Sequence, residues 1–507
     1  MTGLDSLGLL APEIALTAGG LAILILGLIW RNQKAYAPLS GLGIVAALAA
    51  AGLGLAAGGT GSLPQGMLAA DPFAHFFRVL GAGCAALVLV LALGRPSLGN
   101  EFPGLLLFAT LGILLTAAAA NLIMIYVGIE LLSITSYVLA GLLRQEPRSN
   151  EAAIKYFFYG AVASAVMVYG LSLLMGLSGS VELVGIAASL ARGGLATARW
   201  VALPGIVLMM VGFGFKVAAV PFHQWSPDVY EGAPTPVTAF LSVGPKAAGF
   251  AVMARVLLVA LPALQWDWVV LVAALAVVTM TLGNLVALAQ THMKRLLAYS
   301  SIAQAGYMLI GFVALRAGAP LGAETAPLHV GGATAPLGAE TAPLLGDGVA
   351  ALLVYLVAYL FTNLGAFAVV LAMEDATGSD AIAEYKGLAG RSPLLAGALV
   401  FYFLSLVGIP PLACFLGKLF IFTAAVRAEF YWLAAVGVVN SVISLAYYFN
   451  VVRTMFFEPS SPADRPVGVA ANLAVALGVT WVGTVALVIW ATPMLEWAAR
   501  SVALLVH

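Results

Sequence analysis

Long apolar segments follow one another along almost the whole chain, and they constrain its fold more than any other feature. A helix needs about 20 mostly apolar residues to cross a bilayer. On that rule the sequence holds about fourteen such segments, near residues 9–30, 39–58, 73–94, 103–119, 121–143, 152–176, 200–222, 236–263, 268–290, 295–315, 350–372, 394–424, 431–456 and 468–492. Only 9% of the 507 residues are charged, whereas soluble domains carry about 25%. The sequence therefore predicts an all-α polytopic membrane protein and excludes a soluble enzyme.

Basic residues predict the orientation of these helices. If the N-terminus lies outside and the helices alternate, most basic residues fall on the inner side, as the positive-inside rule requires. The inner set is Arg31, Lys34, Arg95, Arg144, Arg148, Lys155, Lys294, Arg295, Lys386, Arg391, Arg453 and Arg465, and the outer set is Arg192, Arg199, Arg316, Arg427 and Arg500. We expect an even number of helices with both termini outside. The nearly continuous fourth and fifth segments are expected to separate at Ala120–Asn121.

Motifs that hold a cofactor or a metal are not expected on this chain. Cys84 and Cys414 stand alone in apolar runs and the five histidines are scattered, so neither a zinc site nor an iron–sulfur site is predicted. No glycine-rich phosphate-binding motif opens a strand–helix unit. A formal net charge of zero gives no reason to expect nucleic-acid binding. The N-terminal segment lacks a positively charged start, which favours a retained helix over a cleaved signal peptide.

Among the ionisable side chains inside the apolar segments, Glu130, Lys216, Lys246 and Lys418 are the candidates for a functional role. Such groups are expensive in a membrane unless they are paired, protonated or hydrated, and they commonly mark ion pathways. A buried lysine beside a movable carboxylate can switch between its charged and neutral forms, whereas an arginine stays protonated. We therefore predict a proton pathway through these four residues, with Glu130 paired to Lys216. Structural ion pairs that hold helices together are the alternative.

Prolines interrupt two of the predicted helices close to these lysines. Pro221 follows Lys216, and Pro410 and Pro411 precede Lys418. A proline frees backbone carbonyl groups, and in a membrane these groups must meet water, side chains or other helices. Broken helices in two halves of one chain are typical of transporters built from inverted repeats. Simple packing kinks are the alternative.

Polar residues near these positions are secondary candidates. His223, in the loop after the first break, is either a proton entrance or gate, or a local hydrogen-bonding residue. Tyr299 and Gln304 lie in the tenth segment, where polar side chains either hold water or join helices. Asp228 and Glu231 either draw protons to the inner surface or are simply solvated.

Three other features have structural interpretations. Arg78 lies near the outer start of the third segment and is expected to extend its charge to the membrane surface. Arg255 is expected to be a buried structural charge. Residues 316–349 contain APLGAETAPL twice, beginning at Ala319 and at Ala335. They are expected to form a flexible outer loop, an insertion without function.

Several motifs resemble a known family. KVAAVPFHQWSPDVYEGAPTPVTAFLSVGPKAAGF (216–250), HMKRLLAYSSIAQAGYM (292–308) and GIELLSITSYVLAG (128–141) closely resemble the antiporter-like subunits of respiratory complex I, the proton-translocating NADH:quinone oxidoreductase. Within them, PDVYEGAPTPV is similar to the N, or subunit 2, type. The resemblance implies fourteen helices with two inverted five-helix repeats, each containing a broken helix. It divides the chain into a three-helix segment (1–102), a first repeat of helices 4–8 (103–265), a second repeat of helices 9–13 (266–457) and a C-terminal helix (458–507).

The resemblance also implies roles for single residues. Glu130 matches the glutamate of the fifth helix and Lys216 the lysine of the seventh. Lys246 matches the connecting lysine of the eighth helix, and Lys418 the lysine of the broken twelfth. Several relatives have histidine where this chain has Gln304, so proton uptake at that position is not implied.

The surroundings expected for such a subunit follow from the same resemblance. NADH oxidation, the iron–sulfur chain and the quinone pocket belong to partner subunits, so the chain itself would carry no cofactor. The expected partners are adjacent antiporter-like and small membrane subunits in a bacterial plasma membrane. A subunit of a multi-subunit cation/proton antiporter is the first alternative, and a purely structural membrane scaffold is the second.

Overall fold

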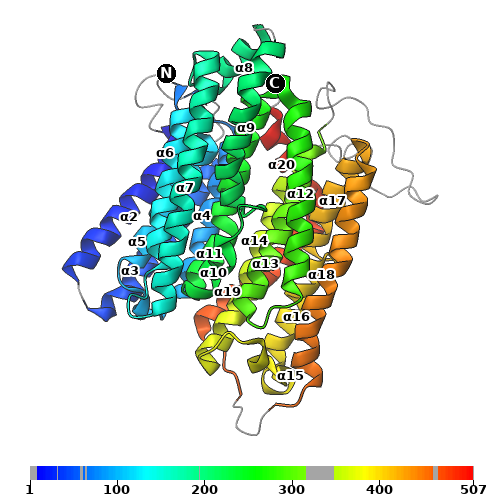
Figure 1. Cartoon of the computed structure of the whole chain (residues 1–507). Helices are drawn as coiled ribbons and strands as arrows, with labels where there is room; N and C mark the ends of the chain where they lie inside the picture. Colours follow the sequence, from blue (N-terminus) through cyan, green and yellow to red (C-terminus); the bar gives the residue numbers. More distant parts are fainter. Residues whose placement is uncertain are drawn as a thin grey trace.

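The computed structural model describes residues 8–30, 32–56, 61–62, 66–192, 195–315, 348–460 and 466–505. These residues form a bundle of long helices (Figure 1). Among them, twelve helices are long and apolar enough to cross a membrane: α2 (Ala11–Ile29), α3 (Tyr36–Ala56), α4 (Pro72–Ala92), α6 (Leu122–Ala140), α7 (Pro147–Ser178), α9 (Leu195–Val217), α11 (Thr235–Ala254), α12 (Gln265–Ala287), α13 (Met293–Val313), α14 (Gly348–Thr377), α18 (Tyr431–Phe457) and α19 (Ala471–Ile489). The prediction of an all-helical membrane protein is confirmed at this level.

Shorter elements complete the described part of the chain. The short α-helices are α5 (Phe102–Ala118), α8 (Leu183–Arg192), α10 (Trp225–Gly232), α15 (Leu388–Arg391), α16 (Pro393–Val407), α17 (Ala413–Arg427) and α20 (Ala491–Ala503). Single turns of other helix types are η1 (Gln33–Ala35), η3 (Pro96–Leu98), η4 (Arg255–Ala260), η5 (Pro262–Leu264) and η7 (Ile382–Tyr385). The two-residue strands β1 (Gly61–Ser62) and β2 (Ala69–Ala70) pair antiparallel. Figure 1 places α8 and α20 at one end of the bundle and α15 at the other.

One predicted segment is divided into two helices, and another ends early in a turn. The segment 394–424 becomes α16 and α17, separated by residues 408–412, which contain both prolines. In the segment 200–222, α9 ends at Val217 and the chain turns before α10 begins at Trp225. The fourth and fifth segments do separate at the predicted place, because Asn121 caps α6 by accepting a hydrogen bond from the backbone N–H of Met124 at 2.7 Å.

The predicted range of the loop, 316–349, extends two residues too far. Residues 316–347, which include the duplicated motif, lie outside the described residues. Helix α14 begins at Gly348, so the last two residues of that predicted loop belong to a helix.

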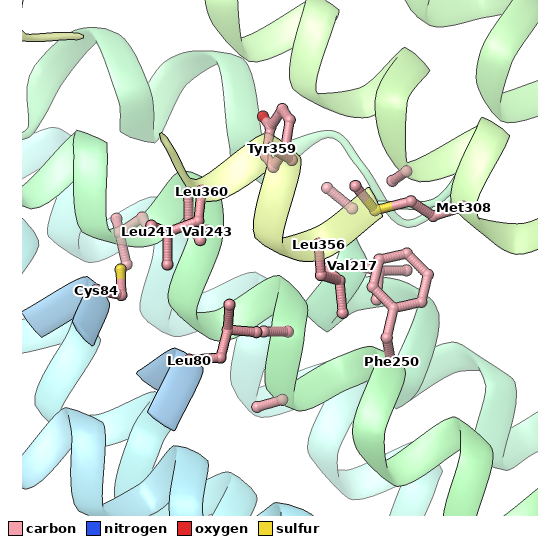
Figure 2. Close-up of a cluster of buried hydrophobic side chains, with 14 of the residues drawn as sticks. Leu80, Cys84, Val217, Leu241, Val243, Phe250, Met308, Leu356, Tyr359 and Leu360 are labelled. Carbon is pink, nitrogen blue, oxygen red and sulfur yellow. The ribbon is translucent and has the colours of Figure 1, made fainter. Parts of the chain in front are cut away.

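The core of the bundle lies around α11, whose residues are all buried. Figure 2 shows side chains of α11 packed against those of α4, α9, α13 and α14, including Leu241, Val243, Phe250, Leu80, Cys84, Val217, Met308, Leu356 and Leu360. Glycines allow the closest helix contacts. A Cβ atom at Gly112 would lie 2.6 Å from the backbone nitrogen of Leu132, and one at Gly306 would lie 2.5 Å from that of Met280. The pairs α5–α6 and α12–α13 therefore pack backbone to backbone, as membrane helices with small residues do.

The ends of α7 and α14 carry the same turn. Ser178 Oγ donates to a carbonyl one turn earlier and accepts from the backbone N–H of Ser180 at 3.3 Å. Thr377 Oγ1 makes the same pair of contacts, accepting from Ser379 at 3.3 Å. The glycine inside each turn, Gly179 or Gly378, has φ of +70° or +74°, a conformation that favours glycine.

Each of these turns is followed by the same kind of pairing. Glu182, just after the first turn, forms an antiparallel bridge with Asn121 in the α5–α6 connection. Ala381, just after the second turn, forms one with His292 in the α12–α13 connection. Two distant parts of the chain therefore share one local design.

Two buried arginines brace the bundle. The prediction that Arg78 reaches the membrane surface is wrong, because its side chain is fully buried and Nε donates to Glu13 Oε1 at 2.7 Å. The carboxylate of Glu13 on α2 makes burial of this charge possible. The prediction that Arg255 is a buried structural charge is confirmed. Its Nη1 and Nη2 donate to the two carboxylate oxygens of Asp71, and its Nε donates to the carbonyl of Ala117.

Candidate functional site

Lys418 is held by the helix break that precedes it. Its Nζ donates to the main-chain oxygens of Leu406 (3.1 Å) and Val407 (2.8 Å), which lie in the last turn of α16. The last carbonyls of a helix have no partner within the helix and carry a partial negative charge. Nζ also lies 4.2 Å from the centre of the Tyr307 ring, a favourable cation–π distance. The broken helix thus stabilises a buried ammonium group with neutral acceptors.

Gln304 belongs to the same site. Its Nε2 donates to the carbonyl of Leu406 at 2.9 Å, so it shares this acceptor with Lys418. The hydroxyl of Tyr355 donates to Gln304 Oε1. Both ends of the buried amide are therefore used in fixing the break, which is a positioning role.

Lys246 lies on α11 and is almost completely buried, with 2% of its surface exposed. Its Nζ donates to the carbonyl of Ser301 on α13 at 2.7 Å. Ser301 lies three residues before Gln304, so one face of α13 contacts the surroundings of both Lys246 and Lys418.

Lys216 lies in the last turn of α9 and is equally buried, with 2% exposed. Its Nζ has no hydrogen-bond partner among the residues that the structure describes, and it lies 5.5 Å from the centre of the Phe215 ring. The carbonyl of Phe215 accepts a hydrogen bond from Trp225 Nε1 at 3.0 Å. At this break, therefore, an indole and not the lysine satisfies the freed carbonyl.

Glu130 lies on α6, half-buried, and accepts a hydrogen bond from Ser164 of α7. The prediction of a direct Glu130–Lys216 ion pair is wrong, because the two side chains do not approach within 4.0 Å. Their charges interact electrostatically over a longer distance. Ser164 anchors the carboxylate towards α7, whereas Lys216 Nζ, without a hydrogen-bond partner in the described part of the chain, lies over the Phe215 ring.

The secondary candidates lie at the margins of this site. His223 lies between α9 and α10, and its Nδ1 is buried without a hydrogen-bond partner in the described part of the chain. Tyr299 on α13 is half-buried and makes none of the lysine contacts given above. Pro221, Pro410 and Pro411 all lie in the non-helical breaks.

Ser164 and Tyr355 also belong to the site, although no sequence pattern indicates them. Ser164 is one small residue among several in α7, and Tyr355 is one of many aromatic residues in apolar helices. Their contacts join helices that are distant in sequence, so no local motif distinguishes them.

A charged cluster lies beside α10. Asp228 accepts hydrogen bonds from Lys155 (2.6 Å) and from Arg295 (2.8 Å), and Arg295 also donates to Glu231. Partial burial raises the pKa of Asp228, but these two donors outweigh burial and hold its pKa below the ordinary value. The cluster lines a cavity of about 300 Å³ together with Arg148. Asp228 and Glu231 are therefore engaged in ion pairs and are not merely solvated.

Comparison with known proteins places the chain in a family. Residues 119–323 and 329–444 match the family model described as NADH:quinone oxidoreductase/Mrp antiporter, TM. NADH-quinone oxidoreductase subunit N 2 of Symbiobacterium thermophilum is 42% identical over 97% of this chain and 96% of that protein. Subunit N of Trichlorobacter lovleyi is 41% identical over 99% and 98%. The chain belongs to the NADH-quinone oxidoreductase subunit N family.

Solved structures agree with this membership in the subunit N family. A chain of respiratory complex I from Thermus thermophilus with bound aureothin has a TM-score of 0.76 and 31% identity, covering 96% of this chain and 99% of that chain. A chain of the Mrp complex from Dietzia sp. has a TM-score of 0.81 but only 21% identity, covering 100% and 98%. The second likeness shows a common fold alone. The residues that match the family model include Glu130, Lys216, Lys246 and Lys418.

Proposed function

We propose that the chain translocates protons as a membrane subunit of NADH:quinone oxidoreductase, along a row formed by Glu130, Lys216, Lys246 and Lys418. The observation that carries the proposal is that none of the three lysines lies within 4.0 Å of a carboxylate among the described residues. Structural ion pairs would place a carboxylate on each lysine, as Asp71 is placed on Arg255. The three lysines instead meet only backbone carbonyls, aromatic rings or no polar partner.

This arrangement suits reversible protonation. A lysine that is buried among neutral groups gives up its proton more readily than a paired one, and it recovers stability when a negative charge approaches. A movement in an adjacent subunit that changes the Glu130–Lys216 distance would therefore change the proton occupancy of Lys216. The change would pass by charge repulsion through Lys246 to Lys418, which would release its proton outside.

The fold supports the division inferred from the sequence. If α5 and the α16–α17 pair are added to the twelve long helices, the chain would make fourteen membrane crossings. The proposed repeats would run from α5 to α11, close to residues 103–265, and from α12 to α18, close to residues 266–457. The matching turns after α7 and α14 and their matching bridges lie at equivalent positions of the two repeats. Each repeat holds one broken helix, α9–α10 or α16–α17. Residues 1–102 and 458–507 flank the repeats.

The proposed partners and cellular location are inferred from the relatives. Their name describes an enzyme that oxidises NADH and reduces quinone, and this chain would join it beside other antiporter-like and small membrane subunits. The cofactors of that chemistry would lie on partner subunits. The chain would lie in a bacterial plasma membrane with both termini outside, which puts the α10 cluster and Arg148 on the inner side.

A test of the proposal uses the assembled enzyme in proteoliposomes. The variants Lys216→Ala and Glu130→Ala should lower NADH-driven proton uptake and coupled quinone reduction together. Lys386→Ala is the matched control, because this lysine is half-exposed and pairs with Glu458 at the surface. Normal pumping by both site variants would overturn the proposal. Transport that depends on sodium would favour the antiporter alternative.

A further inference from the structure

We propose that protons reach Lys246 from the inner end of the molecule through a polar seam between α11, α13 and α14, which begins at Glu374. The inference rests on the proposed function and adds an entry route to it. The seam is defined by Thr235, Thr238, Ser242 and Asn363. Lys246 would then receive protons independently of Lys216.

The entrance is a cavity of about 600 Å³ beside the first turn of α11. The charged side chains in its wall are Arg95, Arg148, Lys294, Glu146, Glu231, Glu374, Asp375 and Asp380. Carboxylates therefore outnumber the basic groups, and an acidic cleft raises the local concentration of cations. Asp380 is 8% exposed, and one of its carboxylate oxygens has no hydrogen-bond partner in the described part of the chain. Such an oxygen needs a water molecule or a proton.

Glu374 joins this cavity to the seam. It lies near the end of α14, accepts a hydrogen bond from Thr235, and lies 3.4 Å from Lys294 Nζ. Thr235 is the first residue of α11, and only 3% of its surface is exposed. The carboxylate therefore lies where a proton would pass from the cavity into the buried part of the bundle.

The seam continues along one face of α11. Thr238, Ser242 and Lys246 are spaced four residues apart, so they follow one another on the same side of the helix. Asn363 of α14 donates to Ser242 Oγ at 2.6 Å. Thr238 and Ser242 are fully buried, and Asn363 is 1% exposed. A line of hydroxyl and amide groups thus leads through the buried core of the bundle to the lysine.

Several buried polar atoms in this region could bind water molecules. Within the described residues, Asn363 Oδ1, the hydroxyl of Tyr359 and Ser226 Oγ have no hydrogen-bond partner. Figure 2 shows Tyr359 of α14 above Leu360. Buried polar groups without protein partners commonly hold internal water molecules. Water at these atoms would close the gaps between the side chains and allow protons to move to Lys246.

The test measures access to Ser242 from each side of the membrane. In the assembled enzyme, with Cys84 and Cys414 of this chain replaced by alanine, Ser242→Cys is compared with Ala247→Cys. Ala247 lies on the same helix, is 1% exposed and points away from the seam. Methanethiosulfonate ethylammonium is added to membranes with the inner face exposed or with the outer face exposed. Modification is read from the peptide masses of this subunit.

The expected result is modification of Ser242→Cys from the inner face at least about tenfold faster than Ala247→Cys, a difference of about 1.4 kcal/mol in activation free energy. Equal slow rates, or modification from the outer face alone, would overturn the route. If Ser242→Cys does not assemble, Thr238→Cys replaces it with the same expected outcomes. Glu374→Gln should in addition slow NADH-driven proton uptake, whereas Glu496→Gln, on the surface helix α20, should not.

Different experimental results would contradict the proposed entry route and the proposed function. If Lys246→Met abolishes pumping and Ser242→Cys is inaccessible from the inner face, the route is wrong and the proposed function stands. If Lys246→Met pumps normally, the proposed function itself is wrong, whatever the labelling shows.

Discussion

Lys418 Nζ lies 2.8 Å from the main-chain oxygen of Val407, the last residue of the half-helix α16. The helix break and the lysine therefore form one unit, because the break provides the acceptors that the ammonium group needs. Carbonyl oxygens stabilise the charge without being ions themselves. When Lys418 loses its proton, no unpaired carboxylate remains behind, and discharge is less costly than in a buried ion pair.

From this unit we predict that pumping requires proton release by Lys418 and not only its positive charge. Lys418→Arg keeps a positive charge beside Val407, but arginine does not release its proton in proteins. We expect the variant to assemble and to pump at less than about a tenth of the normal rate, a loss of about 1.4 kcal/mol or more in the limiting step. NADH-driven proton uptake by proteoliposomes measures it. A pumping Lys418→Arg enzyme would show that Lys418 acts only as a fixed charge.

Gln304 and Tyr355 are predicted to act together in fixing the break. Gln304→Leu and Tyr355→Phe each leave a buried polar partner unsatisfied, at a cost of about 1–3 kcal/mol. The double variant should cost less than the sum of the two, since the same contact is lost once. Thermal unfolding of the purified enzyme, followed through release of this subunit, gives the three values. Additive effects would contradict a direct contact.

The Glu13–Arg78 pair predicts a stability effect separate from pumping. Glu13→Ala leaves the fully buried Arg78 without its carboxylate, at a cost of about 3–5 kcal/mol. Adding Arg78→Met removes the unpaired charge and should restore most of the lost stability. Thermal unfolding measures both effects, and pumping per assembled enzyme should stay near normal. A double variant no more stable than Glu13→Ala would contradict the pairing.

Asp228 predicts a pH dependence of stability at the charged cluster beside α10. Its pKa in the folded protein lies below the ordinary value of 3.8. Its contribution to stability is therefore fully present above about pH 4 and is lost as the pH falls through the lower, folded value. Because Asp228 is about one-third exposed, Asp228→Asn should cost no more than about 1 kcal/mol at pH 7. The cost should shrink as the pH falls below about 4 in thermal unfolding, whereas a cost that grows towards acid would contradict the ion-pair assignment.

Much of the architecture could be predicted because the membrane imposes simple rules. Spans must be long and apolar, so the segment positions were predictable, and even the Ala120–Asn121 boundary has a local cause in the Asn121 cap. Prolines disfavour the helix interior, so the breaks before Lys418 and after Lys216 were predictable too, although Pro204 and Pro245 lie within the continuous helices α9 and α11. Ionisable residues in such spans are rare, which made Glu130 and the three lysines conspicuous in the sequence.

The contacts between distant helices could not be predicted in this way. The distribution of apolar residues indicates where the helices lie in the sequence. It does not indicate which helices pack against each other. The sequence therefore suggested a Glu130–Lys216 pair from opposite charges, whereas Ser164 holds Glu130. For the same reason Arg78 was expected at the surface, although Glu13, sixty-five residues earlier, allows its burial.

The measurement that tests the account most directly is proton uptake by proteoliposomes that contain the assembled enzyme with Lys246→Met. Within the described residues Lys246 makes one hydrogen bond, to a backbone carbonyl, so its replacement by an apolar side chain of similar length should leave the bundle intact. If the buried lysines conduct protons, NADH-driven uptake and quinone reduction should fall together to less than about a tenth of their normal rates. Unchanged uptake in a fully assembled Lys246→Met enzyme would contradict the account.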